Sequence, residues 1–381
     1  MSSETEFDPA KGLYKLIVTK TEKAKAFWAQ FLAQKEALFA FESSELIKKS
    51  INELLSEYIE GVVVDFVLNQ QGQPETMVIS ANWNNYYFQY VILLVQAAPE
   101  IDGIKVQAFR QRINAEERDF SIPVGDVSLS PSDILVSLAP DELNGCIDIQ
   151  IYINKAIDKE QEEYAQKMFV LMLNLILGEY DTFVRVRCID FAKTQAEDEE
   201  WIPLPELPEV LDKIWEEQLG HTQHFPEEGQ MQYASFDYGN EDDNEDSYIY
   251  GVVNFSAHSV ACRVDLAYCL CVSIALDDKP VEEINKLEKT IIRQIHSTQL
   301  GIHILTVVTL DDGIKSVYFH TGDVLASLKI LEKTVLPFRD LNLNIGVDIR
   351  YEPRWEQYHK WVPAHQPMVG PLTPHFFEEP F

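Results

Sequence analysis

The order of apolar segments in the second half of the chain is the feature that most constrains its fold. Residues 268–276 form a nearly continuous apolar run, which predicts a strand covered on both faces. Apolar side chains then recur at helical spacing over residues 281–299. The triplet Asp311-Asp312-Gly313 predicts a tight hairpin turn. The remaining predicted segments are strands at 303–310, 315–320 and 343–350 and a helix at 323–335.

This series has the order β-α-β-β-α-β, which predicts a ferredoxin-like (split βαβ) domain, with a further strand at 248–255 added in front. The first half mixes helices and strands in a way that permits the same interpretation, beginning with a strand at 13–18. We therefore expect an α+β fold of two domains, whose antiparallel or mixed sheets are covered by helices. The other segments predicted in the first half are helices from Thr21, from Glu45 and over 84–98, 158–177 and 206–219, and strands at 62–68, 76–80, 104–109, 147–153 and 183–189.

The length of 381 residues is typical of two domains, each large enough to bury a core. We expect an N-terminal α+β domain over residues 1–219 and an acidic junction over 220–247. The ferredoxin-like domain is predicted over 248–362. The tail, residues 363–381, is rich in proline and is predicted to be extended.

Acidic residues outnumber basic ones by two to one. The 62 Asp and Glu against 31 Lys and Arg give a formal net charge of −31. Such a surface repels phosphate groups, so direct nucleic-acid and membrane binding are not expected. Solubility alone can explain the excess acid, and the alternative is a basic protein partner. The acid is concentrated near the junction, at 197–200 and 241–246.

Five cysteines, no CxxC pair and no apolar leader at the N-terminus indicate a reducing compartment, and we expect a cytoplasmic protein. Cys269 and Cys271 lie two apart in an apolar run, where they would face the same way as small hydrophobic side chains.

Glycine spacing excludes several catalytic families. No two of the 16 glycines are closer than nine positions, so a GxGxxG fingerprint and a P-loop are both absent. GxSxG and HExxH are absent as well. No cofactor and no catalytic residue is therefore predicted from motifs, and oligomeric state is left open.

Three weaker patterns have an ordinary structural interpretation beside a functional one. His221 and His224 would share a helix face and could hold a metal ion, but Gly220 and Pro226 favour a loop. Glu179 and Asp181 could do acid–base chemistry, although a solvated helix-to-strand turn is favoured. Arg110 and Arg112 could hold an anion or pair with neighbouring acids, and the acidic block 241–246 lacks the pattern of an EF-hand.

The aromatic segment YEPRWEQYHKW, residues 351–361, offers candidate partner contacts. Trp and Tyr are favoured anchors at interfaces, whereas the alternative is that they cover the open end of the second domain's core. The predicted partner-binding residues are Trp355, Tyr358, Trp361, Asp242, Asp243 and Glu245.

Residues 230–363 resemble an uncharacterised bacterial domain family, the domain of unknown function 695. The shared features are the element order, the turn at 311–313, the YFHTGD segment at 318–323 and the closing Asp348, Trp355, Tyr358 and Pro363. The first half resembles another uncharacterised bacterial pattern through FWAQF at 27–31, ISA at 79–81 and VQAFRQR at 106–112.

Domains of this kind are distantly similar to acidic, ferredoxin-like inhibitors of ribonuclease E, which also end in a Trp and Tyr pair. That resemblance implies a regulator that binds a protein. The leading hypothesis is thus a non-enzymatic binding or regulatory protein with an acidic face. The alternatives are a hydrolase with carboxylates in an inter-domain cleft and an immunity-type inhibitor of a basic nuclease.

Overall fold

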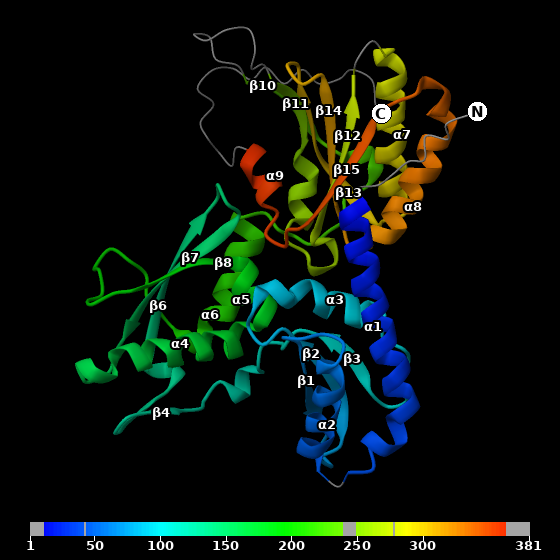
Figure 1. Ribbon diagram of the computed structural model, residues 1–381. Helices are drawn as coiled ribbons and strands as arrows, with labels where there is room; N and C mark the ends of the chain where they lie inside the picture. Colours follow the sequence, from blue (N-terminus) through cyan, green and yellow to red (C-terminus); the bar gives the residue numbers. More distant parts are fainter. Residues whose placement is uncertain (1–10, 42, 239–248, 277–278, 363–381) are drawn as a thin grey trace. The chain divides into compact units, whose positions relative to one another are not determined.

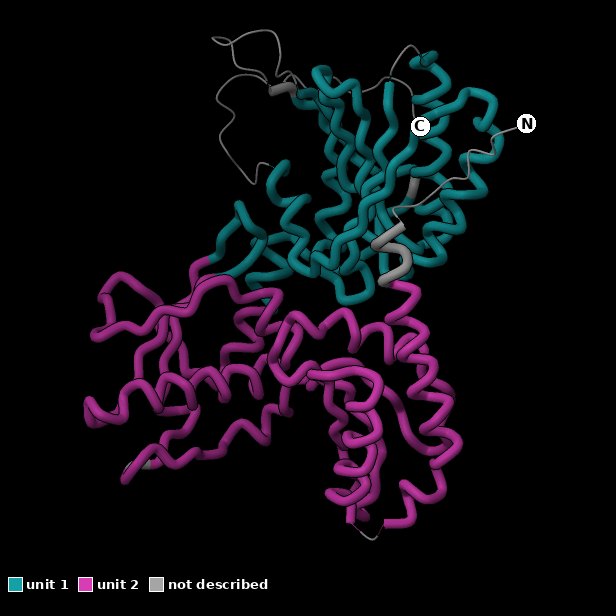
Figure 2. The backbone as a smooth tube through the Cα atoms, in the orientation of Figure 1, with its two compact units in different colours: residues 1–13, 140–147, 212–381 teal, residues 14–139, 148–211 magenta. Residues whose placement is uncertain are grey.

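The computed structural model describes residues 11–41, 43–238, 249–276 and 279–362. The chain forms two compact units of mixed helices and sheets (Figure 2), which confirms the α+β class. Unit 1 contains residues 1–13, 140–147 and 212–381, and unit 2 contains residues 14–139 and 148–211. The division at 211/212 lies near the predicted boundary at 219, and a short segment, 140–147, joins unit 1 from the middle of the first half.

Unit 1 is built on a six-stranded antiparallel sheet in the order β10-β11-β13-β14-β12-β15 (Figure 1). The four strands that follow residue 267 have the order β13-β14-β12-β15, as a ferredoxin-like domain requires. The added strands β11 and β10 extend the β13 edge. The strands are β10 Tyr233–Tyr238, β11 Ile249–Asn254, β12 Tyr268–Ala275, β13 Gly301–Thr309, β14 Ile314–Thr321 and β15 Ile345–Tyr351.

The helices α7 (Val281–Ser297) and α8 (Val324–Val335) cover one face of this sheet and pack against each other. The predicted stripe of α7 is buried from Ile284 onward, whereas Val281, at its first position, is exposed. Asp323 caps α8 through its carboxylate, which accepts the N–H of Ala326 at 2.9 Å. On the other side of the sheet lies α9 (Glu356–Trp361), which follows β15 after a short turn (Figure 1).

Strand β12 has both edges paired, and most of its side chains are buried on both faces. Cys269 pairs with His320 of β14, and Cys271 pairs with Tyr318. Directly paired residues on neighbouring strands point to the same face of a sheet, so Cys269 and His320 share one face. The predicted hairpin at 311–313 joins β13 to β14, with Gly313 at a φ of +58°.

The first element of unit 2 is one long helix, α1 (Lys11–Leu38), which lies in unit 2 from Tyr14 onward, whereas a strand was predicted at residues 13–18. That prediction is wrong because the apolar residues before Thr21 continue the helical spacing, so Ile17 joins Phe27 and Phe31 in the core. Helix α2 (Ser44–Ser56) follows as predicted. A small sheet, β1-β2-β3, comes next, with β1 Val63–Leu68, β2 Pro74–Ser80 and β3 Lys105–Ala108; α3 (Phe88–Gln96) links the parallel strands β2 and β3.

A second sheet of unit 2 has the order β8-β7-β6-β9. Its strands are β6 Ile134–Asp141, β7 Cys146–Ile153, β8 Val186–Phe191 and β9 Ile202–Pro203, and a hairpin of β4 Ile122–Val124 and β5 Val127–Leu129 lies apart from it. Because the strands of the first half divide among separate sheets, that half does not repeat the ferredoxin-like order.

Three further predictions need correction. Part of the predicted strand at 183–189 is helical, because α4 (Glu162–Leu177) is followed by α5 (Glu179–Arg185) after a break at Gly178, where φ is +82°. The predicted helix at 206–219 comprises α6 (Leu207–Lys213) and one wider π turn, and the predicted junction contains β10.

Among the helices of the described ranges, none combines the length and the apolar run needed to cross a bilayer.

Candidate functional site

Three side chains of metal-binding type meet in the interior of unit 1. Cys269 comes from β12, His320 from β14, and Glu352 from the residue directly after β15. The backbone N–H of Glu352 donates to the carbonyl of Ala267 at 2.8 Å, which continues the β12–β15 pairing by one step. The thiol sulphur, one imidazole nitrogen and one carboxylate oxygen all lie within 4.8 Å of one another. We call these three residues the Cys-His-Glu centre.

The His320 ring has a fixed orientation. Its Nδ1 lies 2.9 Å from the carbonyl oxygen of Leu266, and because a carbonyl can only accept, Nδ1 carries the proton. The indole of Trp355 stacks on the ring at 4.0 Å and 12°. Burial lowers the pKa of His320 to about 3, so the ring is neutral at physiological pH. Its Nε2 therefore presents a lone pair, and it has no hydrogen-bond partner among the described residues.

Glu352 is held in a similar way at one of its two oxygens. Oε1 accepts the backbone N–H of Gln357, at the start of α9. Oε2 has no hydrogen-bond partner within the described ranges and lies 3.8 Å from His320 Nε2. Burial, together with the nearby charge of Glu356, raises the pKa of Glu352 to about 7. The carboxyl group thus changes protonation state near neutrality.

The thiol of Cys269 is not an activated nucleophile in this state. Its side chain is buried, and burial and the negative charge of Glu352 raise its pKa far above the ordinary value. A catalytic cysteine needs the opposite shift, which comes from nearby positive charge and partial exposure. The chemistry open to the centre is therefore ion binding rather than thiolate attack.

Of the predicted aromatic pair, Trp355 covers this centre from one side by stacking on His320, and Tyr358 packs against Trp355. Trp355 is fully buried and donates its indole N–H to Leu266 O at 3.0 Å; Tyr358 is also buried and donates its hydroxyl to Asn254 O at 3.1 Å. Both residues thus lie in the core of their own unit, which agrees with the alternative that large aromatic side chains supply core area. Trp361 is half-buried and stacks on Phe236 at 5.1 Å.

A partner-binding role for these three aromatic residues stays a prediction, and the placement of Trp355 and Tyr358 does not favour it. The other residues of that prediction, Asp242, Asp243 and Glu245, lie outside the described residues.

Residues 221–227 are not helical, which confirms the loop that Gly220 and Pro226 favoured, and His221 and His224 therefore do not share a helix face. The buried ring of His221 lies between Trp215, at 4.2 Å, and His258, at 4.5 Å, while His224 is exposed. Both ring nitrogens of His221 face carbonyl oxygens, those of His258 and Gly145, at 3.1 and 3.3 Å. Burial lowers the pKa of His221 well below its usual value.

The predicted carboxylate pair 179/181 and the two arginines serve the architecture of unit 2. Glu179 is almost fully buried at the start of α5, and its two oxygens accept the backbone N–H groups of Trp83, at 3.0 Å, and Arg110, at 3.2 Å. The helix start replaces the solvated turn that the sequence favoured. The guanidinium of Arg110 pairs with Asp65 at 2.7 Å, and Arg112 pairs with Asp181 at 2.8 Å, so both arginines have internal partners rather than an open anion site.

Unit 2 also presents an exposed acidic segment, residues 197–209, with six acidic side chains and no basic one. Strand β9 anchors it, because Ile202 and Pro203 pair with β6 at the edge of the sheet. Trp201 is half-buried, packs edge-on against Tyr152 at 6.3 Å and donates its indole N–H to Ala196 O at 3.3 Å. The acidic residues are Glu197, Asp198, Glu199, Glu200, Glu206 and Glu209.

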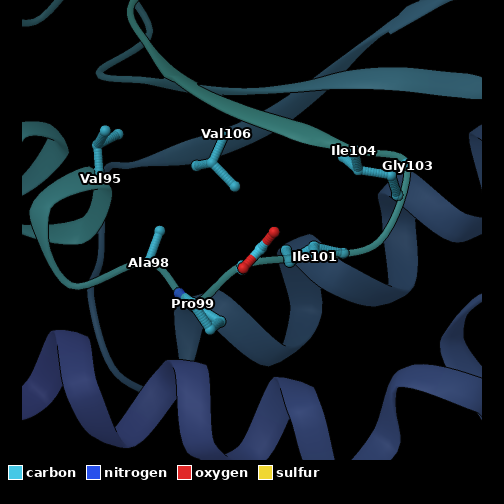
Figure 3. Close-up of a pocket in the computed structure, with 8 residues that line it drawn as sticks. Val95, Ala98, Pro99, Ile101, Gly103, Ile104 and Val106 are labelled. Atoms are coloured by element: carbon cyan, nitrogen blue, oxygen red, sulfur yellow. The ribbon is translucent and has the colours of Figure 1, made fainter.

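An open depression of about 480 Å³ lies between the end of α3 and the start of β3 (Figure 3). Val95, Ala98, Ile101 and Val106 line it together with the exposed Glu100, the one charged side chain of the lining. It has no converging polar groups of the kind that orient a small-molecule ligand.

Comparison with known proteins gives no functional assignment: no family model matches the chain, and neither a curated protein nor a solved structure matches it. The resemblances noted for each half of the sequence therefore stay predictions.

Sequence reasoning missed the Cys-His-Glu centre, although each member lay in a segment that had been singled out. Cys269 was interpreted as a small hydrophobic residue, His320 lies in YFHTGD, and Glu352 lies in YEPRW. The available signal was a cysteine in one predicted strand and a histidine in another predicted strand of the same sheet. Their pairing became visible only with the strand register.

Proposed function

We propose that this protein acts by binding a basic protein partner through the acidic segment 197–209, and not by catalysis. The observation that carries the proposal is the combination of six exposed acids, of which only Glu209 has a basic partner, Arg118 at 2.9 Å, and a backbone pairing with the edge of a sheet. A segment fixed before binding loses little conformational freedom on association, which favours affinity. Trp201, half-buried within the segment, is a residue type enriched at interface hot spots.

The distribution of arginine supports the same partner class. Seven arginines of the described chain form ion pairs with its own acids, among them Arg110, Arg118 and Arg187. Phosphate recognition needs guanidinium groups that are free to bind bidentately. The net charge of −31 and this internal pairing favour a Lys- and Arg-rich protein over a nucleic acid.

The burial of the perturbed groups weighs against an enzyme. Cys269, His320 and Glu352 have shifted pKa values, but each is at most 9% exposed, so a substrate does not reach them in this conformation.

The test compares two quadruple variants, each of which removes four negative charges. The first is Glu197→Gln, Asp198→Asn, Glu199→Gln and Glu200→Gln. The control is Glu36→Gln, Glu53→Gln, Glu57→Gln and Glu60→Gln, four exposed acids on other parts of unit 2. Binding of a labelled Lys- and Arg-rich peptide is followed by fluorescence anisotropy at several salt concentrations.

We expect the first variant to bind about tenfold more weakly at physiological salt, since several exposed charge pairs together contribute about 1.4 kcal/mol. The control should stay within about threefold of the wild type. Equal losses in both variants would mean that net charge alone drives binding, and the segment would lose its role. Absence of binding even at low salt would remove the proposed function altogether.

A further inference from the structure

Two polar atoms of the Cys-His-Glu centre are buried, lie close together and have no hydrogen-bond partner in the described part of the chain. They are His320 Nε2 and Glu352 Oε2, 3.8 Å apart. The Cys269 sulphur lies within 4.8 Å of a ring nitrogen of His320 and of a carboxylate oxygen of Glu352. Buried polar groups nearly always have a hydrogen-bond partner, so two neighbouring exceptions indicate that an ion or a water molecule binds between them.

The remaining atoms of the same side chains are satisfied in the pattern that metal ligands show. A metal-binding histidine usually donates its other N–H to a backbone carbonyl or a carboxylate, which fixes the ring and its tautomer. His320 Nδ1 does this with Leu266 O, and the same carbonyl accepts the indole N–H of Trp355. The second oxygen of Glu352 accepts the N–H of Gln357. Each side chain is therefore oriented from outside, with its free atom directed inward.

From this geometry we infer that Cys269, His320 and Glu352 form a binding site for a divalent transition-metal ion, with zinc as the best fit. One sulphur, one imidazole nitrogen and one carboxylate oxygen are ligand types that zinc accepts together. Calcium and magnesium prefer shells made of oxygen, so this set disfavours them. A water molecule would take the fourth coordination position of the ion, because Glu352 Oε1 already accepts a backbone N–H.

The distances require only a small contraction. Zinc bonds of about 2.0–2.3 Å at tetrahedral angles place ligand atoms about 3.3–3.6 Å apart. The observed 3.8 Å between His320 and Glu352 is a few tenths of an ångström wider, and no pair exceeds 4.8 Å. Side-chain movements of about an ångström or less would bring the thiol into range, without a change in the strand register.

The ion would join three neighbouring strands of the sheet, in the order β14-β12-β15. Its ligands come from β12, from β14 and from the residue after β15, and Trp355, between Glu352 and α9, stacks on one ligand. Since each ligand is at most 9% exposed, a substrate does not reach the ion in this conformation, and its role is to link the three strands of unit 1. Binding displaces the thiol proton and the carboxyl proton, so affinity rises with pH.

A single buried water is the main competing occupant. Water could bridge His320 Nε2 and Glu352 Oε2, and it would leave the thiol protonated. Cobalt(II) separates the two cases, because it substitutes for zinc and gives a thiolate-to-metal charge-transfer absorption only when a deprotonated cysteine binds it. This readout does not depend on any activity or on the partner proposal.

The experiment uses the full chain, purified without chelator, for elemental analysis and then, after chelator treatment, for titration with cobalt(II) and competition by zinc. We expect about one metal ion per chain and a charge-transfer band that zinc abolishes. Because the wild-type spectrum is decisive by itself, the conclusion does not depend on variants that fold poorly. If cobalt(II) gives only the spectrum of the aqueous ion and the metal content is far below one per chain, the metal site is refuted and a buried water is the occupant.

Two matched pairs of variants assign the ligands. Cys269→Ser should abolish the charge-transfer band and weaken zinc binding by about 100-fold or more, since loss of an outer-shell contact alone costs 10–100-fold. Cys271→Ser, two residues along the same strand and on the same face, should keep both. His320→Asn should weaken binding similarly, whereas His224→Asn, at the exposed histidine, should not. Circular dichroism verifies that each variant folds. The assignment would be refuted if the charge-transfer band disappeared in Cys271→Ser but remained in Cys269→Ser.

Discussion

Glu179 holds the carboxyl ends of two parallel strands together, and its removal should destabilise unit 2 by a predictable amount. Its carboxylate accepts the N–H of Trp83, after β2, at 3.0 Å and the N–H of Arg110, after β3, at 3.2 Å. The side chain is only 1% exposed, so water cannot replace it. Nearby backbone is strained, since Asn82, Trp83 and Phe109 all have positive φ, and the carboxylate helps to hold it there.

The substitutions Glu179→Gln and Glu179→Ala remove these contacts in steps. The glutamine retains one oxygen acceptor but directs an amide N–H at the other donor, which should cost about 2–3 kcal/mol, the range of one charge-assisted hydrogen bond. The alanine leaves both backbone N–H groups buried without an acceptor, which should cost about 3–5 kcal/mol. In a unit of this size, each kcal/mol lowers the melting temperature by about 2–4 °C.

Urea unfolding gives the global value, and hydrogen exchange of peptides covering residues 80–84 and 108–112 gives the local one. Exchange in both peptides should accelerate in the variants, while exchange in α7, in the other unit, should not change. Glu206→Gln, at an exposed acid of the same unit, is the control and should change stability by less than about 0.5 kcal/mol. If Glu179→Ala unfolds at the same urea concentration as the wild type, the carboxylate does not hold these strands and the reasoning is refuted.

Three further results are expected. Zinc at a thousand times its dissociation constant should stabilise unit 1 by about 4 kcal/mol, which calorimetry should show as a rise of roughly 10 °C in the unfolding temperature of unit 1, and Cys269→Ser should lose this rise. Trp355→Phe should cost about 2–3 kcal/mol in urea unfolding, because the stack on His320 shrinks and the N–H bond to Leu266 is lost; an unchanged midpoint would contradict the packing described. Burial lowers the pKa of His303 and of His359 to about 3, below the value of about 6.5 in the unfolded chain, so each contributes stability that is lost as pH falls from about 6.5 towards 3, at up to about 1.4 kcal/mol per pH unit. Glu352 opposes this trend, since its raised pKa of about 7 contributes stability that is lost as pH rises from about 4.3 to 7; His359→Phe should reduce the acid-side slope of urea midpoints, and an identical slope would show that His359 is not neutral in the folded state.

The sequence predicted unit 1 well because its elements are locally encoded. The alternation of a buried strand, amphipathic helices and a tight turn follows from spacings of two and 3.6 residues and from a glycine at positive φ. Those signals gave the order β-α-β-β-α-β, and the observed strand order β13-β14-β12-β15 agrees with it. The first half was predicted less well, since residues 11–18 continue a helix whose apolar spacing also fits a short strand.

For the candidate sites too, the sequence indicated which residues matter, whereas tertiary packing decided where they lie. Glu179 was noticed, but the two backbone N–H groups that it accepts lie 96 and 69 residues away, so its burial had no local signal. Trp355 and Tyr358 were recognised as important aromatic residues, and tertiary packing placed them in the core. His221 and His224 were considered as a helical pair, and a loop placed one inside and the other in solvent.

By itself, then, the sequence determined the acidic surface, the α+β class and the ferredoxin-like order, because charge and periodicity are properties of neighbouring residues. Only the tertiary structure decided that Cys269, His320 and Glu352 meet. Their meeting depends on the register of β12 with β14 and β15, and a slip of one residue would turn His320 to the other face of the sheet. Register is set by the packing of the whole sheet against its helices, which no local pattern encodes.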